Sequence, residues 1–192
     1  SYKYTSKKNG SHTKKCTICD YKQVKNCSRY TIKSDGSMVC GDCGYKLASS
    51  FKNGTLTIAY ADASFVNMRG LAYACDYASI NSVVIEEGYT EVANECFRYA
   101  WSLESVKLPS TVSRIGKYAF ASSGLRNCDL STTKATLIDE GAFWACGLEN
   151  IKFPKTLKKL GEYAFAYNYN LKELDFSSTK LESSGFCGLS YL

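Results

Sequence analysis

From about residue 80 to the C-terminus, apolar residues recur with a long and regular period. Leucine or isoleucine stands at five positions that are 22 or 23 residues apart, and phenylalanine at five positions that are 21 to 23 residues apart. Self-similarity at such a period predicts a solenoid, in which successive units stack around a continuous core. The recurring residues are Ile80, Leu103, Leu125, Leu148 and Leu171, together with Phe97, Phe120, Phe143, Phe165 and Phe186.

Each unit opens with apolar and polar residues in alternation, as in LESVKLP at residues 103–109. Alternation with a period of two predicts a short strand with one buried face. Because one unit cannot bury its own apolar face, we expect the strands of successive units to lie side by side in a parallel sheet. The predicted inward columns are Val83, Val106, Cys128, Ile151 and Leu174, and Ile85, Leu108, Leu130, Phe153 and Phe176.

The second half of each unit carries a different signal. An apolar residue is followed four residues later by a small residue and then by phenylalanine, which predicts a helical or irregular turn that closes the coil. The expected fold is therefore an α/β repeat solenoid with about five repeats of 22–23 residues. The apolar residues that begin this half are Val92, Ile115, Ile138 and Leu160.

Two of these units closely resemble the BspA-type leucine-rich repeat: KLPSTVSRIGKYAF at residues 107–120 and FPKTLKKLGEYAF at residues 153–165. The resemblance covers about residues 51–192 and implies a right-handed coil with a parallel sheet. Two departures stand out. The cysteine that the family places after the phenylalanine is kept only at Cys146, and Ser131 stands where proline is usual.

The N-terminal part contains two CxxC pairs that are separated by twenty residues. This spacing predicts a small zinc-ribbon-like head, in which four thiolates hold one zinc ion. Disulfides are the main alternative, because small extracellular domains are often stapled in that way, and free thiols are the other. The predicted ligands are Cys16, Cys19, Cys40 and Cys43, and His12 or Cys27 could replace one of them.

These signals divide the chain into three parts. We expect a Cys-rich module at residues 1–46, a cap and lead-in at residues 47–79, and the repeats at residues 80–192. Within the lead-in, a strand is expected to begin the cap at residues 55–60, and a short helix at residues 71–77. After Leu192 no polar cap follows, so we expect either that the parent protein continues or that a partner chain covers this end, which would allow oligomers.

Charge and candidate chemistry narrow the function classes. Residues 1–54 carry eleven Lys or Arg against three Asp, a net charge of +8, whereas the remainder carries −2, which together make the total of +6. A basic head could bind phosphate or an anionic polymer, although lysines that merely keep the head soluble are the favoured explanation. No apolar run is long enough to span a membrane. With a single histidine and no phosphate-binding loop, we expect no enzyme.

A solenoid offers two candidate binding surfaces. The outward residues of the strands would form a polar strip in which positive and negative side chains alternate. On the turns, aromatic residues gather at Tyr99, Trp101, Trp144, Tyr167 and Tyr169. The predicted partner-binding strip is Val84, Lys107, Asp129, Lys152 and Asp175, flanked by Asn127 and Asn150.

The resemblance implies a non-enzymatic bacterial module, secreted or at the cell surface, for protein recognition or adhesion. Its partners would be proteins such as host matrix proteins, or a glycan. One alternative is a zinc-ribbon nucleic-acid binder whose repeats form an interaction platform, although the head lacks a clear aromatic and basic strip, so nucleic acid is not the expected partner. Another alternative is a structural spacer in a larger surface protein.

Overall fold

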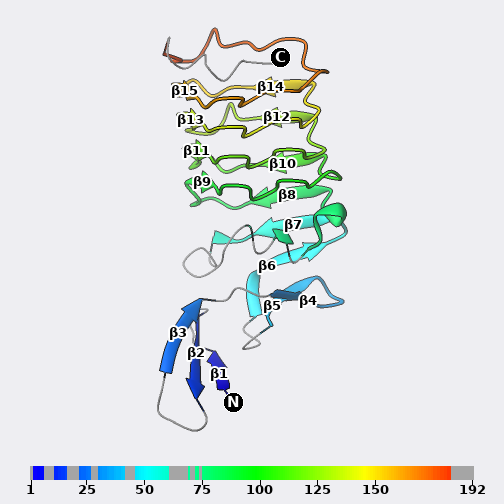
Figure 1. The fold of residues 1–192 in the computed structure, drawn as a ribbon, viewed down its shortest axis with the longest axis vertical. Helices are drawn as coiled ribbons and strands as arrows, with labels where there is room; N and C mark the ends of the chain where they lie inside the picture. Colours follow the sequence, from blue (N-terminus) through cyan, green and yellow to red (C-terminus); the bar gives the residue numbers. More distant parts are fainter. Residues whose placement is uncertain are drawn as a thin grey trace.

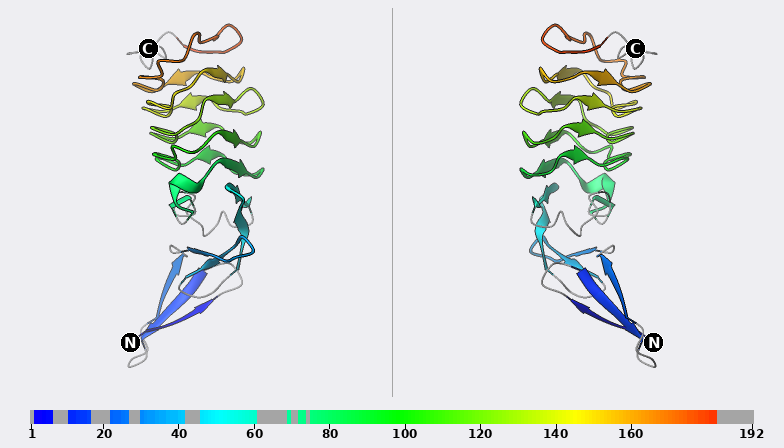
Figure 2. Two further views of the ribbon diagram at one scale, coloured as in Figure 1. Left: turned by 90° about the vertical axis from the view of Figure 1, so that its right-hand side faces the viewer. Right: turned by 90° about the vertical axis from the view of Figure 1, so that its left-hand side faces the viewer.

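The computed structural model describes residues 2–6, 11–16, 22–26, 30–41, 46–60, 69, 72–73 and 75–182, the first three ranges by their strands alone. The described part is a solenoid of about four turns, preceded by two antiparallel sheet regions (Figures 1 and 2). Strands β1 (Tyr2–Ser6), β2 (Ser11–Cys16) and β3 (Lys22–Asn26) form one three-stranded antiparallel sheet.

Each coil of the solenoid contributes one strand to each of two faces. On the first face, β8 (Ser82–Ile85) pairs with β10 (Ser105–Lys107), and β12 (Asn127–Asp129) pairs with β14 (Asn150–Lys152). On the second face lie β9 (Glu91–Val92), β11 (Arg114–Ile115), β13 (Leu137–Ile138) and β15 (Lys159–Leu160), in one sheet. All these pairs are parallel, so the predicted parallel sheet is confirmed.

The fifth predicted repeat is irregular where the structure describes it. Residues 171–182 follow the path of a further coil, because the amides of Lys180 and Glu182 donate to the carbonyls of Leu157 and Lys158, at 3.0 and 3.1 Å. No strand forms within this range. The prediction of a strand there was wrong, and Phe186, the last recurring phenylalanine, lies outside the described residues.

The turn half of each unit was predicted to be helical or irregular, and the helical alternative was wrong. Within residues 75–182 the only helix is the short 3-10 helix η2 (Tyr77–Ser79), so the fold there is all β rather than α/β. The predicted short helix at residues 71–77 lies partly outside the described residues. The closing turns adopt another conformation, in which successive amides donate alternately to the next coil and to a carbonyl of the same turn.

Every second amide of a turn reaches the next coil. In the first coil, the amides of Glu95, Phe97 and Tyr99 donate to carbonyls of the second coil at 2.7–2.9 Å. The amides between them donate back within the same turn, as Arg98 does to Glu95 at 3.4 Å. The same pattern joins the second coil to the third and the third to the fourth. An α-helix cannot form here because it would direct all its amides along its own axis.

This alternation places two residues of each coil in the left-handed region, where side chains are disfavoured. They stand two positions before and two positions after the recurring phenylalanine, and their φ angles lie between 50° and 66°. Only one of the eight is glycine. They are Glu95, Tyr118, Gly141 and Tyr163 in the first column, and Tyr99, Ser122, Ala145 and Tyr167 in the second.

The core is a column of stacked rings at the centre of the coils. Phe97, Phe120, Phe143 and Phe165 are fully buried, and neighbouring ring centroids lie 5.3–5.6 Å apart. The predicted inward columns are confirmed, since six of the ten residues are buried and the other four pack against the core in part. The partly buried residues are Val106, Ile151, Leu174 and Phe176.

The cap belongs to the same sheet as the first coils. β4 (Tyr30–Ile32), β5 (Ser37–Cys40), β6 (Lys46–Lys52) and β7 (Thr55–Ile58) pair antiparallel in chain order, and β7 then pairs parallel with β8. Met38, Leu47 and Leu56 of this sheet join the core of the solenoid. Pairing therefore continues from the predicted head into the repeats, while the predicted boundary near residue 46 stays a prediction.

Ala145→Gly is expected to stabilise the protein by up to about 1 kcal/mol, because a side chain at φ 51° costs about 1–2 kcal/mol and glycine gives part of this back as chain entropy. Ala166→Gly is the matched control. Ala166 is buried with an ordinary backbone, so its loss of a methyl group should destabilise by about 1 kcal/mol. Thermal unfolding followed by circular dichroism measures both. Equal destabilisation by the two variants would contradict the left-handed assignment.

Candidate functional site

The predicted polar strip runs across the first face of the solenoid. Val84 is opposite Lys107 in the β8–β10 pair, and in the β12–β14 pair Asn127 is opposite Asn150 and Asp129 opposite Lys152. All except Val84 are exposed. The structure therefore brings these residues into two paired groups. It separates them between β10 and β12, which are not paired in a sheet, and leaves Asp175 on the irregular segment.

Side chains of the strip form ion pairs and hydrogen bonds with one another. Lys152 Nζ lies 3.7 Å from Asp129 Oδ2, and Asn150 Nδ2 donates to Asn127 Oδ1 at 3.0 Å. One row away, the hydroxyls of Ser105 and Ser82 are 3.0 Å apart. The predicted alternation of charge is confirmed between β12 and β14. The strip is thus neutral as a whole, and its charged and amide side chains on β12 and β14 already have partners.

Ser131, the departure from the family's proline, has a clear role beside this strip. Its hydroxyl and amide donate to Asp129 Oδ1 at 2.6 and 2.9 Å, and these bonds, aided by Lys152, hold the pKa of Asp129 below its ordinary value. Ser177 binds Asp175 in the same way through its amide, at 2.8 Å, and the pKa of Asp175 is also lowered. A serine two residues after each aspartate fixes the turn that follows.

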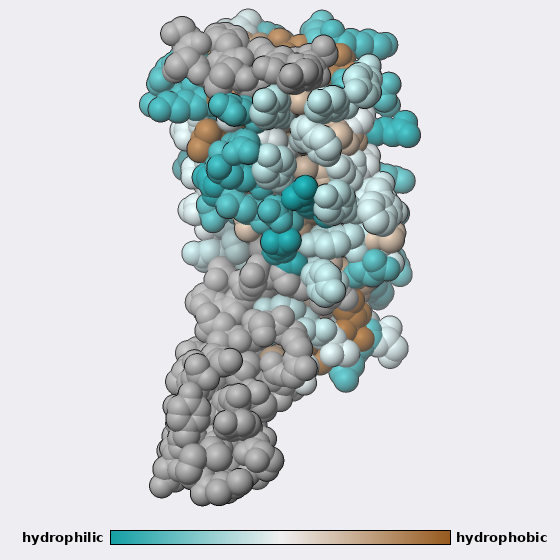
Figure 3. All heavy atoms as spheres, in the orientation of Figure 1, coloured by the Kyte–Doolittle hydropathy of each residue, from teal (hydrophilic) through white to brown (hydrophobic). Residues whose placement is uncertain are grey.

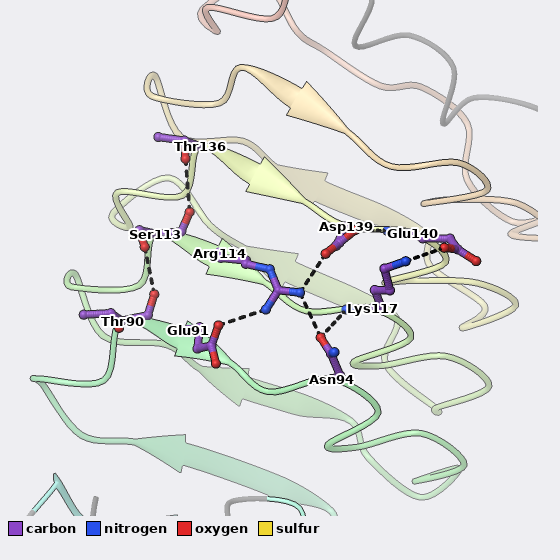
Figure 4. Close-up of polar contacts among 9 residues, drawn as sticks. All are labelled: Thr90, Glu91, Asn94, Ser113, Arg114, Lys117, Thr136, Asp139 and Glu140. Carbon is purple, nitrogen blue, oxygen red and sulfur yellow. Dashed lines mark hydrogen bonds and ion pairs between the residues drawn. The ribbon is translucent and has the colours of Figure 1, made fainter. Parts of the chain in front are cut away.

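The second face carries a charged network centred on Arg114 (Figure 4). Its guanidinium donates to Glu91 Oε2 at 2.8 Å, to Asn94 Oδ1 at 2.9 Å and to Asp139 Oδ2 at 2.7 Å. These partners come from the preceding and the following coil, so one side chain links three coils. Figure 3 shows hydrophilic residues gathered over the side of the molecule where β9, β11 and β13 lie. Arg114 was not among the functional residues predicted from the sequence.

Glu140 is a second paired centre on this face. Lys117 Nζ lies 2.8 Å from Glu140 Oε2, and the Tyr118 hydroxyl donates to Oε1 at 2.7 Å. These bonds, from Lys117 first and then Tyr118, lower the pKa of Glu140. The hydrogen bond from Tyr118 to Glu140 also raises the pKa of Tyr118, because an ionised phenol could no longer donate it. The ion pairs of Arg114 and Lys117 on this face therefore link neighbouring coils.

The turns expose a group of large aromatic side chains with one arginine, here called the aromatic turn patch. Arg98 stacks on the rings of Tyr99 and Tyr118, 4.8 and 5.2 Å from their centroids, and Trp144 meets Tyr167 edge to face at 5.5 Å. Tyr99, Tyr163 and Tyr167 are 47 %, 40 % and 37 % exposed. The patch consists of Arg98, Tyr99, Tyr118, Trp144, Tyr163 and Tyr167.

Three of these residues were missed from the sequence: Arg98, Tyr118 and Tyr163. Tyr118 and Tyr163 stand in the same repeat column, two residues before the phenylalanine, so the periodicity contained the signal. A shallow hollow of about 410 Å³ lies between Arg98, Tyr118, Trp144 and Tyr163, within the range of roughly 300–1,000 Å³ found for ligand sites.

Three of the six candidate zinc ligands can be placed. His12 lies in β2, Cys16 ends β2 and Cys40 ends β5, whereas Cys19, Cys27 and Cys43 lie outside the described residues. In the part of the chain that is described, no cluster of three or more His, Cys, Asp or Glu side chains is arranged to hold a metal ion. No helix among the described residues has the length and apolarity needed to cross a membrane.

The cysteines of the repeats fill the core. Cys75, Cys96, Cys128 and Cys146 are buried free thiols, and burial raises the pKa of each, for Cys75 and Cys146 to about 12. Thiols with raised pKa values are poor nucleophiles. Cys146 donates to the carbonyl of Phe120 at 2.8 Å, and Asn168, in the same repeat column, donates to the carbonyl of Phe143 at 2.7 Å. Asn168 thus replaces the family's cysteine as a donor.

Comparison with known proteins relates the chain to one family. The family described as BspA type leucine-rich repeat region matches residues 71–192, with six copies of its repeat. The prediction was about five, beginning at residue 80. No curated protein matches the chain significantly.

Two solved structures are similar to the chain at low identity. A leucine-rich repeat protein from Eubacterium ventriosum is 17 % identical, with 81 % of this chain and 44 % of that one covered and a TM-score of 0.47. A leucine-rich cell surface protein from Faecalibacterium prausnitzii is also 17 % identical, with 95 % and 56 % covered and a TM-score of 0.32. The chain spans about half the length of these proteins.

Arg114→Met is expected to destabilise the solenoid by about 1–3 kcal/mol, because it leaves the carboxylate of Asp139, only 17 % exposed, without its cation. Arg126→Met is the matched control. Arg126 is 72 % exposed and meets one carboxylate, Glu149, at 3.3 Å, so its loss should change the free energy of unfolding by less than about 0.5 kcal/mol. Urea unfolding compares the two variants, and equal losses would remove the proposed linking role of Arg114.

Proposed function

Because this chain belongs to the family of BspA-type leucine-rich repeat proteins, we propose that it is a non-catalytic bacterial module that recognises a protein partner. Stacked repeats present extended surfaces on a rigid core, which suits protein recognition. The proposal extends to a secreted or cell-surface setting and to adhesion, with host matrix proteins as the partner class. For the whole protein, of which this chain could be a part, the same function is proposed.

The observation that carries the proposal is the aromatic turn patch. Tyr, Trp and Arg dominate the energetics of protein interfaces because they bury large areas with little loss of side-chain entropy. Here Tyr99 in the first coil and Tyr163 and Tyr167 in the fourth are exposed, and the half-buried Tyr118 and Trp144 lie in the two coils between them. Intercoil hydrogen bonds fix the backbone beneath these side chains. A partner that covered the patch would gain apolar contact without having to order the site first.

The polar strip fits a supporting part in the same interface. Lys152 with Asp129 and Asn150 with Asn127 already pair on the exposed surface, so a partner would gain little by replacing these contacts. Such groups at an interface select against wrong partners more than they add affinity. We therefore propose the aromatic turn patch as the energetic centre and the strip as a rim.

Binding to a panel of matrix proteins, fibronectin and fibrinogen among them, tests this proposal. With the chain immobilised for biolayer interferometry, Tyr99→Ala and Tyr163→Ala should each weaken binding by about tenfold or more, whereas the double variant Lys107→Glu/Lys152→Glu should weaken it by less. Circular dichroism checks that each variant is folded.

Two outcomes would count against it. If the unaltered chain binds none of the panel above a scrambled-sequence control, the adhesion proposal fails. If the strip variant loses binding while both tyrosine variants retain it, the strip is the energetic centre.

Zinc in the N-terminal region is a separate proposal, with Cys16, Cys19, Cys40 and Cys43 as ligands. Cys40 supports it, because this side chain ends β5 and is only 1 % exposed, as a ligand of a closed structural site would be.

Native mass spectrometry of the full chain should find one ion of the mass of zinc, lost on denaturation. Cys40→Ser should abolish this binding, and the control Cys146→Ser should keep it. A mass deficit of two hydrogens for each bridge, without metal, would establish disulfides instead. The alternative nucleic-acid role predicts affinity that falls steeply with salt, which a gel shift at two salt concentrations detects.

A further inference from the structure

We propose that a groove at one corner of the solenoid binds a neutral oligosaccharide. Two adjoining hollows, of about 410 and 490 Å³, meet at Arg126 and Asn170 and form what we call the corner groove. Trp101 lines the first hollow and Tyr169 the second. This site lies beside the aromatic turn patch, since the rings of Tyr167 and Tyr169 are 6.2 Å apart, but it shares no residue with it.

The groove arises from a length difference between coils. From the recurring phenylalanine to the next leucine, the first and fourth coils have seven residues, FRYAWSL and FAYNYNL, whereas the second and third have six, FASSGL and FWACGL. The additional residue accompanies an aromatic side chain in both long coils, Trp101 and Tyr169. The short coils end in Gly124 and Gly147. Two long coils thus form the walls and two short coils form the floor.

The glycines keep this floor low. A Cβ atom at Gly124 would lie 2.1 Å from the carbonyl oxygen of Trp101, so the second coil can approach the first only with glycine here. At Gly147, with a φ of +80°, a Cβ atom would meet nothing within 4 Å and would project into open space. Ser123 and Cys146, the residues before these glycines, are 4 % exposed and turn inward.

The walls offer two exposed aromatic surfaces. Trp101 is 63 % exposed and Tyr169 is 83 % exposed. Three coil spacings separate them, which is about 14 Å at the usual distance between neighbouring strands. Such rings pack against the apolar face that the C–H groups of an equatorially substituted sugar present, while the hydroxyls at its rim need hydrogen-bond partners.

Hydrogen-bond donors and acceptors lie between the two rings. Asn81 and Asn170 can donate and accept, Glu104 accepts, and Arg126 donates. Arg126 has donors to spare, because its contact with Glu149 uses one nitrogen and the side chain is 72 % exposed. Planar side chains that offer donors and acceptors side by side suit the paired hydroxyls of a sugar ring.

Charge in the groove selects the kind of sugar. Glu104 and Glu149 offset Arg126 and Lys172 among the lining residues, so the site has no net charge. Two carboxylates would repel a polyanion, whereas they would not repel a neutral chain of β-linked, equatorially substituted sugar units. This inference goes beyond the proposed protein recognition and does not depend on it.

Fluorescence titration tests the inference directly. The chain has two tryptophans, so in a Trp144→Phe background Trp101 alone reports on the groove. The probes are cellohexaose, β-1,4-mannohexaose and chitohexaose, with heparin as the polyanion. We expect saturable quenching by at least one neutral hexasaccharide, with an affinity that changes less than about twofold between low and high salt.

Variants separate this groove from the neighbouring patch. Isothermal titration with the quenching sugar should show that Trp101→Ala and Tyr169→Ala each weaken binding by about tenfold or more, by analogy with the loss of other stacking contacts. Tyr163→Ala, in the aromatic turn patch, should leave sugar binding unchanged while it weakens protein binding.

Four outcomes would overturn the inference. The first is that no neutral hexasaccharide binds saturably, and the second is that both groove variants keep the sugar affinity of the unaltered chain. The third is a preference for heparin with steep salt dependence. The fourth is that no sugar binds and Trp101→Ala loses protein binding. The last outcome would assign the groove to the protein interface. Failure of the matrix-protein panel alone would leave sugar binding intact, so the two proposals fail independently.

Discussion

Hydrogen bonds between the turns of successive coils are the interaction on which the rest of this structure depends. Alternate amides of each turn reach the next coil, and this requires two left-handed residues in every coil. The cost of these conformations is met only while neighbouring coils are present to accept the bonds. The coil and the stack are therefore formed together, which is why a single repeat has no independent fold.

The same arrangement explains why the surfaces differ. The two strand faces place side chains of adjacent coils about 4.8 Å apart, so charged and amide groups there pair with one another. Arg114 pairs with Asp139 on one face, and Asn150 pairs with Asn127 on the other. At the turns, backbone amides and carbonyls of neighbouring coils bond to each other, so the side chains are not needed to satisfy these groups. Large aromatic residues can stand exposed there without loss of structure, and these are the groups that a ligand can use.

A small change in coil length then alters the shape of the surface without disturbing the core. The phenylalanine rings stay stacked at 5.3–5.6 Å through all four coils, although the first and fourth coils carry one additional residue after the ring. The additional residue is taken up at the surface, where it builds a wall. A repeat protein can vary its recognition surface in this way while its core columns stay fixed.

The sequence by itself determined the solenoid, its period and its inward columns, because burial of one apolar face per unit is written in residues such as Leu103 and Phe120 that recur at fixed distances. It also predicted the pairing of Asp129 with Lys152, which follows from register in a parallel sheet. Only the tertiary structure decided that the turns are not helical, that Arg114 joins three coils, and that Trp101 and Tyr169 frame a groove. These features depend on contacts between residues 20 or more positions apart, whose geometry the local pattern does not contain.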